Sequence, residues 1–340
     1  MAEHGAGPRR GGRNRIALMT AGIVVVYIAF VQWIWGWPYI IAAWQEVGVR
    51  NILVALTLLV ATYFVRAHRM KDYFPRETAG RFLWLFRVTQ IHNILNIMLP
   101  LRTGETSFPL LMRSEFGVPL AHGTSALLVL RLLDLHALLA AAGVGLVASA
   151  GFSLWASGLW LAFLVSPLAV FPFRDPVLAV ARKKLPQRFS KLVDEVDDGI
   201  PRNLAAFIRA WALTVLNWGV KVLVLAWVLA LMGVGPLAAC FGGALGGEIS
   251  SVLPVHAPAG VGTYPAGIAA GAAAFGADKG AGAAAVLAKA SINTHLLMIV
   301  SALAGTGVSL LLPVLAGVGR RGHAENRAES RGENRERQGD

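Results

Sequence analysis

The chain is poor in charge and has a single cysteine, and both shortages restrict what it can be. Of its 340 residues, 15% are charged, whereas a soluble globular domain carries about 25%. The single cysteine, Cys240, excludes an intramolecular disulfide, and its apolar Gly/Ala surroundings indicate a buried, inert thiol. The histidines are scattered and give no metal-ligand spacing. We therefore expect neither a disulfide framework nor a metal site.

Signatures of nucleotide binding and of catalysis are also missing. The chain contains no G-x-x-x-x-G-K-[ST] phosphate loop, so we expect no direct ATP binding and no cofactor. No Ser/His/Asp arrangement stands out, and we do not expect an enzyme. A net charge of +12 would suit a nucleic-acid partner, but the basic residues flank apolar runs instead. We expect no nucleic acid as a partner.

What the chain has in abundance is apolar sequence. It is 56% hydrophobic, its mean hydropathy is +0.58, and it contains runs of about 20 residues that could cross a hydrocarbon core of about 30 Å. The first run is long and has no cleavage site, so it resembles a span rather than a secretory signal. The sequence predicts an all-α polytopic membrane protein with about six full transmembrane helices, at Ile16–Gly36, Asn51–Arg66, Thr124–Ala150, Ser153–Phe171, Leu204–Gly233 and Ala281–Val318.

Basic residues gather in four stretches, and their positions predict the orientation. The stretches are 1–15, 66–87, 174–202 and 320–337. Because lysine and arginine are retained on the cytoplasmic side, we expect a multi-pass inner (plasma) membrane protein with both termini in the cytoplasm. The aromatic run WIWGWPYIIAAW (Trp33–Trp44) then falls at the outer interface, where tryptophan and tyrosine are enriched.

The parts outside the spans divide the chain further. We predict a basic cytoplasmic N-terminus at 1–15, a transmembrane domain at 16–318 and a disordered cytoplasmic tail at 319–340, which is low in apolar residues. The loop at 174–202 mixes both charge signs with apolar residues at helical spacing. An amphipathic helix on the inner membrane surface and a solvated structural loop explain that pattern equally well.

Two segments, Arg81–Pro119 and Gly235–Gly276, are apolar but interrupted. Each contains a Leu-Pro followed by a glycine-containing break and another apolar stretch. Irregular backbone at membrane depth is tolerated only inside protein or against a wet cavity. We therefore predict two re-entrant, broken-helix segments in an inverted repeat, with repeats at about 51–171 and 204–318. Two ordinary helices packed through Gly and Ala would imitate this pattern.

Three motifs carry a resemblance to a known family. NIMLPLRTGE, RLLDL about 30 residues later and LPVHAPAGVGTY resemble the lysylphosphatidylglycerol synthase transmembrane family, or flippase-like integral membrane proteins. The resemblance implies the lipid-translocating half without the soluble aminoacyl-transferase domain, because only a short tail follows Val318. Pro265 stands near the place where the family often has an acidic residue, in a G-x-G-x-x-E pattern. Whether Pro265 alters activity, and whether Glu248 compensates, stays open.

Arg102 and Glu105 are the strongest candidates for a binding role. A charge at the bilayer centre costs about 2.5–3.5 kcal/mol or more, so such residues are paired or face a wet cavity. In one interpretation Arg102 holds a lipid phosphate and Glu105 pairs with it; in the other they form a structural ion pair. Arg131 and Asp134 share a helix face, as a permanent pair or as a gate.

The second interrupted segment and its neighbours supply further candidates. His256 could titrate near neutral pH or be hydrogen-bonded in a polar kink. Lys289 could line the same cavity as Asn293 and His295, whereas we interpret Lys221 as a cation that snorkels to an interface. The full set of predicted site residues is Asn96, Pro100, Arg102, Gly104, Glu105, Arg131, Asp134, Glu248, Pro254, His256, Gly260, Gly262, Tyr264 and Lys289.

These features favour a lipid translocase that moves a phospholipid or other amphiphile across the bilayer. The alternatives are an intramembrane lipid-modifying transferase and a non-transporting accessory protein. Membrane lipids are the expected partners, and a homo-oligomer or a separate lipid-synthesising enzyme is left open. The sequence does not name the lipid, the direction of transport or the energy source.

Overall fold

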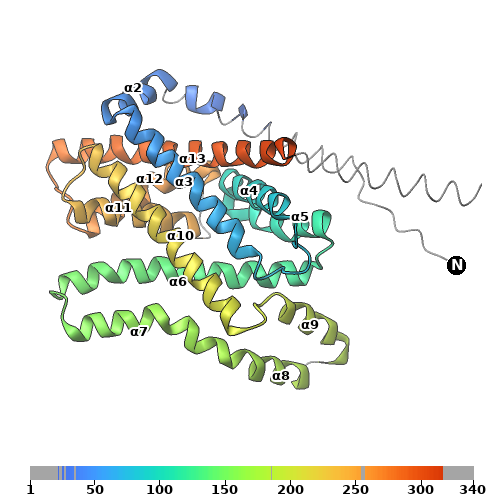
Figure 1. The fold of residues 1–340 in the computed structure, drawn as a ribbon. Coiled ribbons are helices and arrows are strands. Elements are labelled where there is room, and N and C mark those ends of the chain that lie inside the picture. Colours follow the sequence, from blue (N-terminus) through green and yellow to red (C-terminus); the bar gives the residue numbers. More distant parts are fainter. Residues whose placement is uncertain are drawn as a thin grey trace, which may run out of the picture.

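The described part of the chain is built from helices and turns and contains no strand (Figure 1). The computed structural model describes residues 22, 25–26, 28–33, 36–184, 186–253 and 257–316. Five of its helices are long and apolar enough to cross a membrane: Val49–Met70, Leu120–Ser149, Leu154–Lys184, Leu204–Leu231 and Ala281–Leu315. They match five of the six predicted spans, which confirms an all-α polytopic membrane protein. The first predicted span, 16–36, lies largely outside the described residues.

The helices follow two similar paths along the chain. The first consists of α3 (Val49–Met70), α4 (Phe82–Met98), the short helix η1 (Pro100–Thr106), α5 (Ser107–Phe116) and α6 (Leu120–Ser149). The second consists of α10 (Leu204–Leu231), α11 (Leu237–Val252), η4 (Pro258–Gly260), α12 (Thr263–Ala274) and α13 (Ala281–Leu315). Helix α2 (Trp37–Val47) precedes the first path, and α7 (Leu154–Val170), α8 (Arg174–Lys184) and α9 (Ser190–Asp198) connect the two.

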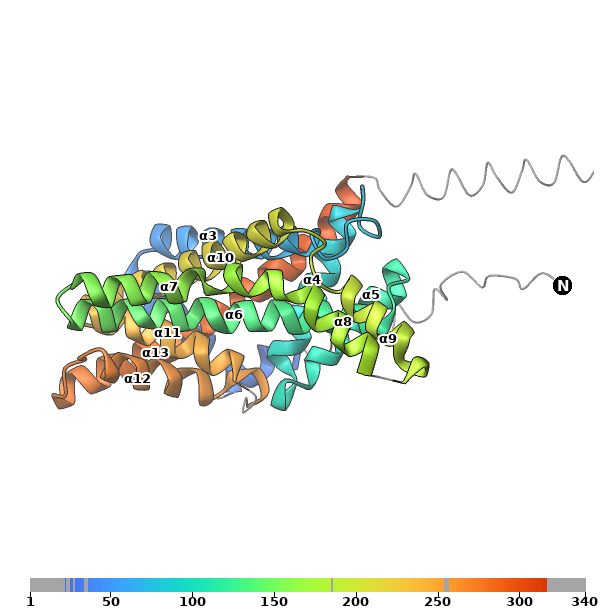
Figure 2. The same cartoon turned by 90° about the horizontal axis from the view of Figure 1, so that it is seen from below.

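The packing of the two paths is reciprocal. Helix α3 packs against its counterpart α10. Helix α4 of the first path packs against α13, the last helix of the second path. In the same way, α11 of the second path packs against α6, the last helix of the first path. The short helices η1 and η4 also contact each other. Figure 1 shows α3 and α10 crossing the molecule together, and Figure 2 shows α6 beside α7. This exchange of neighbours is the arrangement that an internal two-fold axis produces.

Both interrupted segments are broken in the same way. Helix α4 ends at Leu99 and α11 at Leu253, both in extended conformation and both followed by proline. The residue before a proline is pushed out of the helical region, which explains where each helix stops. Non-glycine residues with left-handed backbone follow in each break, namely Leu101 and Arg102 in the first and Ala259 in the second. Such positions are sparsely populated and persist only where the surroundings impose them.

The second helix of each segment begins with the same pattern of residues. Helix α5 starts Ser-Phe-Pro and α12 starts Thr-Tyr-Pro. The hairpins differ in how they close. In the second, a Cβ added to Gly271 would overlap the carbonyl oxygen of Gly242, so α11 and α12 touch through backbone. In the first, a Cβ at Gly104 would lie 2.5 Å from the Cα of Asn96, so η1 needs glycine to fold against α4.

The loop predicted at 174–202 contains two short helices, α8 and α9, which pack against each other. Arg174 and Arg182 both form ion pairs with Asp197 across this contact. Partial burial opposes ionisation of Asp197, but the hydrogen bonds from the two arginines hold its pKa below the usual value. Helix α9 also packs against α6, which ties the loop to the bundle. By contrast, α7 has no buried residue.

Candidate functional site

A small polar cavity lies where the two paths meet. Its walls come from α3, α4, η1, α6, α10, α11 and α13, and it offers about 40 Å³ to water molecules, which is room for one or two of them. The lining residues are Tyr63, Arg66, Asn93, Asn96, Ile97, Arg102, Arg131, Trp218, Lys221, Ser251, Val252 and Met298. Most of them are polar, although the helices that supply them are apolar.

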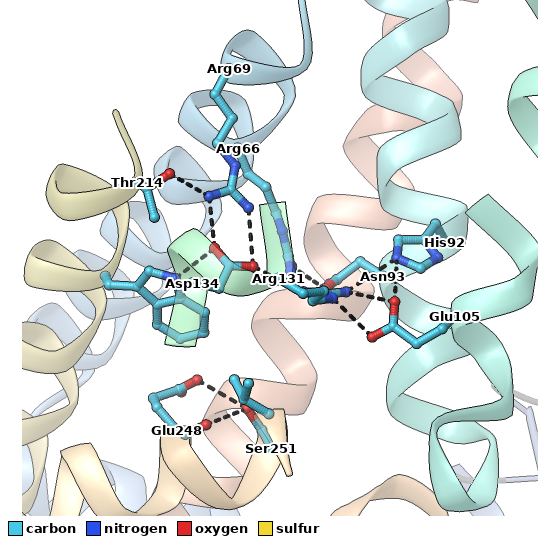
Figure 3. Close-up of polar contacts among 12 residues, drawn as sticks. Arg66, Arg69, His92, Asn93, Glu105, Arg131, Asp134, Thr214, Glu248 and Ser251 are labelled. Atoms are coloured by element: carbon cyan, nitrogen blue, oxygen red, sulfur yellow. Dashed lines mark hydrogen bonds and ion pairs between the residues drawn. The ribbon is translucent and has the colours of Figure 1, made fainter. Parts of the chain in front are cut away.

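Asp134 of α6 is the most heavily bonded carboxylate beside this cavity. It accepts hydrogen bonds from Arg69 of α3 at 2.7 and 3.2 Å, from Arg131 at 3.0 Å and from the indole of Trp218 at 2.8 Å. Arg69 also donates to Thr214 of α10. Figure 3 shows these side chains converging from three helices. The predicted pair of Arg131 and Asp134 is present, and it belongs to a larger fixed network.

Glu105 of η1 is the second anion of this network. It pairs with Arg102 and, at 2.9 Å, with Arg131 of α6. Figure 3 shows Glu105 facing Arg131 and His92. His92 of α4 lies beside it, with Nε2 3.3 Å from a guanidinium nitrogen of Arg131 and Nδ1 3.0 Å from the hydroxyl of Ser107. Guanidinium only donates, so Nε2 is the acceptor. His92 is therefore a neutral ring that orients Arg131.

Arg102 joins the two breaks. Besides Glu105, its guanidinium donates to the carbonyl oxygen of Val252, in the last turn of α11. The last four carbonyl groups of an α-helix have no hydrogen-bond partner within the helix, and the carbonyl of Val252 is one of them. The left-handed backbone of Arg102 aims the side chain across the gap toward the second segment. The cavity wall is thus closed by one arginine that bridges both halves.

A separate ionic pair lies in the second half. Lys221 of α10 donates to Glu248 of α11 at 2.7 Å, and the hydroxyl of Tyr264 donates to the other oxygen of Glu248 at 2.7 Å. Glu248 is fully buried. The expectation that Lys221 snorkels to an interface is wrong, because a carboxylate on the next helix holds it beside the cavity.

Arg66 of α3 has a neutral partner in the equivalent place. Its guanidinium donates to the side-chain oxygen of Asn93 at 2.7 Å. Arg66 and Lys221 are each the eighteenth residue of their helices, and Asn93 and Glu248 are each the twelfth of theirs. The two contacts therefore join corresponding positions of the two paths. One half supplies a carboxylate there, and the other half supplies an amide.

Seven of the predicted site residues lie in or directly behind the cavity wall, and two more belong to the first break. Asn96, Arg102 and Arg131 line the cavity, and Glu105, Asp134, Glu248 and Tyr264 form the layer of contacts behind it. Gly104 allows the first break to close, and Pro100 begins η1.

Other predicted residues lie elsewhere. Lys289 is nearly half exposed and pairs with Glu46, so it does not share the cavity. His295 is buried behind Tyr264. Gly260 and Gly262 have positive φ in the second break, and at Gly262 the conformation rather than close packing requires glycine. Pro254 and His256 lie outside the described residues.

Several residues of the site were not among the predicted ones. Arg66 and Arg69 were counted with a basic cytoplasmic cluster, yet both belong to α3, which continues to Met70. His92 and Asn93, two polar residues within the interrupted segment Arg81–Pro119, were not among the predicted site residues either. A signal was available, since both fall on the buried part of α4 just before its break.

Comparison with known proteins agrees with the fold and the motifs. The chain matches the family described as lysylphosphatidylglycerol synthase TM region over residues 18–318. No curated protein and no solved structure gives a significant match. The match covers all the broken helices and every residue of the cavity. The chain is thus a multi-pass membrane protein of the lysylphosphatidylglycerol synthase TM region family, a family linked to lipid handling.

Proposed function

We propose that the protein is an inner-membrane lipid translocase. One observation carries the proposal: a polar cavity lined by four cations lies between two broken helices of an apolar membrane protein. A lipid headgroup is an anionic, membrane-bound ligand whose charge would complement these cations. Its phosphate would be bound by Arg102 and its neighbours, while the acyl chains stay in the bilayer. Arginine suits this role because it stays charged and binds phosphate oxygens in pairs.

The two breaks indicate where the lipid headgroup would pass through the protein. Discontinuous helices at a repeat interface are the usual location of transporter sites, and Arg102 connects the breaks directly through Val252. In the present conformation the cavity is too small for a headgroup, because about 40 Å³ is far below the volume of ordinary ligand sites. Transport would therefore require this bridge to open, so that the headgroup replaces the carbonyl of Val252 as partner of Arg102.

The test is a transport measurement in proteoliposomes with a phospholipid that carries a fluorescent group on an acyl chain, so that its headgroup stays native. A membrane-impermeant reductant quenches only the outer leaflet, so transport appears as additional quenching. Arg102→Gln should abolish transport while the protein remains monodisperse, and Arg102→Lys should restore it in part. Arg209→Gln is the matched control, since Arg209 forms an exposed pair with Asp72 away from the cavity. Full transport by Arg102→Gln would contradict the proposal.

Two further measurements separate the alternatives. A lipid-modifying transferase would convert its lipid in detergent solution, where a translocase has no measurable product. An accessory protein would tolerate loss of the cavity charges.

We further propose that both termini are cytoplasmic and that Trp33–Trp44 lies outside. Labelling of Ser190→Cys from outside intact cells, in a Cys240→Ser background, would contradict that orientation.

A further inference from the structure

The cations of the cavity outnumber the carboxylates beside it. The wall contains Arg66, Arg102, Arg131 and Lys221, and among the described residues no carboxylate is exposed on it. The three nearby carboxylates lie behind the wall and are already engaged by cations. Glu248 forms an ion pair with Lys221, Glu105 pairs with Arg102 and Arg131, and Asp134 pairs with Arg131 and Arg69.

The imbalance amounts to two positive charges. In the first half, the four arginines Arg66, Arg69, Arg102 and Arg131 share only Glu105 and Asp134, whereas the pair of Lys221 and Glu248 is balanced. His92 adds no charge, because its ring accepts from Arg131 and donates to Ser107. A buried charge without a counterion is strongly unfavourable, so the site favours a ligand that carries two negative charges.

Part of the imbalance can be traced to a single position. Where the second half has Glu248 opposite Lys221, the first half has Asn93 opposite Arg66. The amide nitrogen of Asn93 is buried near the hydroxyl of Tyr63 and makes no close hydrogen bond to a described residue, so it offers a donor beside Arg66. A donor at the place of the missing carboxylate suits a phosphate oxygen.

From this charge balance we infer that the headgroup is dianionic, a terminal phosphate monoester or a diphosphate diester on a lipid, and that Asn93 with Arg66 selects it. The inference rests on the proposed function and specifies its substrate class. A zwitterionic or aminoacylated headgroup brings a cation, and no carboxylate of the described wall is available to receive it. A phosphodiester brings one negative charge and leaves one cation of the site uncompensated.

The test compares phosphatidic acid, phosphatidylglycerol and phosphatidylethanolamine as ligands of the purified full-length chain. Native mass spectrometry titrations give a dissociation constant for each lipid. We expect phosphatidic acid to bind at least about tenfold tighter than phosphatidylglycerol, since one charge-assisted contact is worth about that factor. Phosphatidylethanolamine should bind weakest. Equal binding of phosphatidic acid and phosphatidylglycerol would overturn the inference.

Asn93→Asp is the decisive variant, because it supplies the missing carboxylate with almost no change in shape. It should pair with Arg66 and lower the preference for phosphatidic acid about tenfold, while the protein melts no lower than the wild type. Asn51→Asp is the control, since the amide of Asn51, at the start of α3, donates to the carbonyl oxygen of Val47 at the end of α2 and does not line the cavity. An unchanged lipid preference in Asn93→Asp would refute the role of this position.

Two further outcomes separate the possible failures. Displacement of phosphatidic acid by glycerol 3-phosphate at similar concentration would assign the site to a soluble phosphate and overturn the lipid assignment. In proteoliposomes, transport of phosphatidylglycerol at or above the rate of phosphatidic acid would overturn the dianion inference and leave the translocase proposal standing. Transport of neither lipid would count against the translocase itself.

Discussion

Replacing Asp134 by asparagine removes the charge at the centre of the buried network and little else. In the wild type, Asp134 is 0% exposed and Arg69 is 1% exposed, and two hydrogen bonds of 2.7 and 3.2 Å join them. In Asp134→Asn, Arg69 keeps Thr214 but loses its only carboxylate among the described contacts. Removing one partner of a buried ion pair costs about 3–5 kcal/mol. We expect the free energy of unfolding to fall by about that amount.

The measurement is an SDS titration of the purified protein in mixed micelles. Its control is Asp194→Asn, which breaks an ion pair of the same chemistry with Arg182, and these two side chains are 64% and 44% exposed. Exposed pairs contribute about 0–1 kcal/mol, so the control should unfold close to the wild type. If Asp134→Asn also unfolds within about 1 kcal/mol of the wild type, which is the size expected for an exposed pair, then Asp134 does not compensate a buried charge on Arg69.

Three further predictions concern the scaffold. Gly271→Ala should destabilise the protein by about 1–3 kcal/mol, because its Cβ would overlap backbone of α11; Gly307→Ala, which has open space around it, should unfold like the wild type in the same titration. Gly104→Ala should abolish transport, because its Cβ would displace η1 from α4; undiminished transport would show that the break can adapt. The pKa of Asp197 is lowered mainly by its hydrogen bond from Arg174, against partial burial, so its stabilisation is present above the unfolded pKa of about 3.9 and is lost as pH falls further. The hydrogen-exchange rate of the α9 amides, corrected for intrinsic rates, should therefore rise below that pH. In Asp197→Asn the same amides should exchange fast already at pH 7. Protection of α9 that does not depend on pH would contradict this.

The breaks of the two segments could be predicted from sequence because their causes are local. A proline fixes the conformation of the residue before it, so Leu99 and Leu253 end helices whatever surrounds them. The i, i+3 spacing likewise brings Arg131 to Asp134 without reference to the rest of the fold. Such inferences need only the residues on either side.

The rest of the site depends on tertiary packing, and sequence gives little information about it. Arg66 and Arg69 follow an apolar run, so the hydropathy of the sequence predicts that the span ends at Arg66. The helix nevertheless continues to Met70, because Asp134 and Thr214 from two other helices receive Arg69 inside the protein. The contact of Lys221 with Glu248 was missed for the same reason, since it depends on how α10 packs on α11.

The contact between α11 and α12 has a consequence for how this sequence can change over time. Gly242, Gly246, Gly267 and Gly271 place backbone directly on backbone, so none of them can gain a side chain unless the facing helix moves. The substitutions open to α7 are far more numerous, because it has no buried residue and its side chains need only remain apolar. Relatives that diverge from this chain should therefore differ first along α7 and last along the α11–α12 contact.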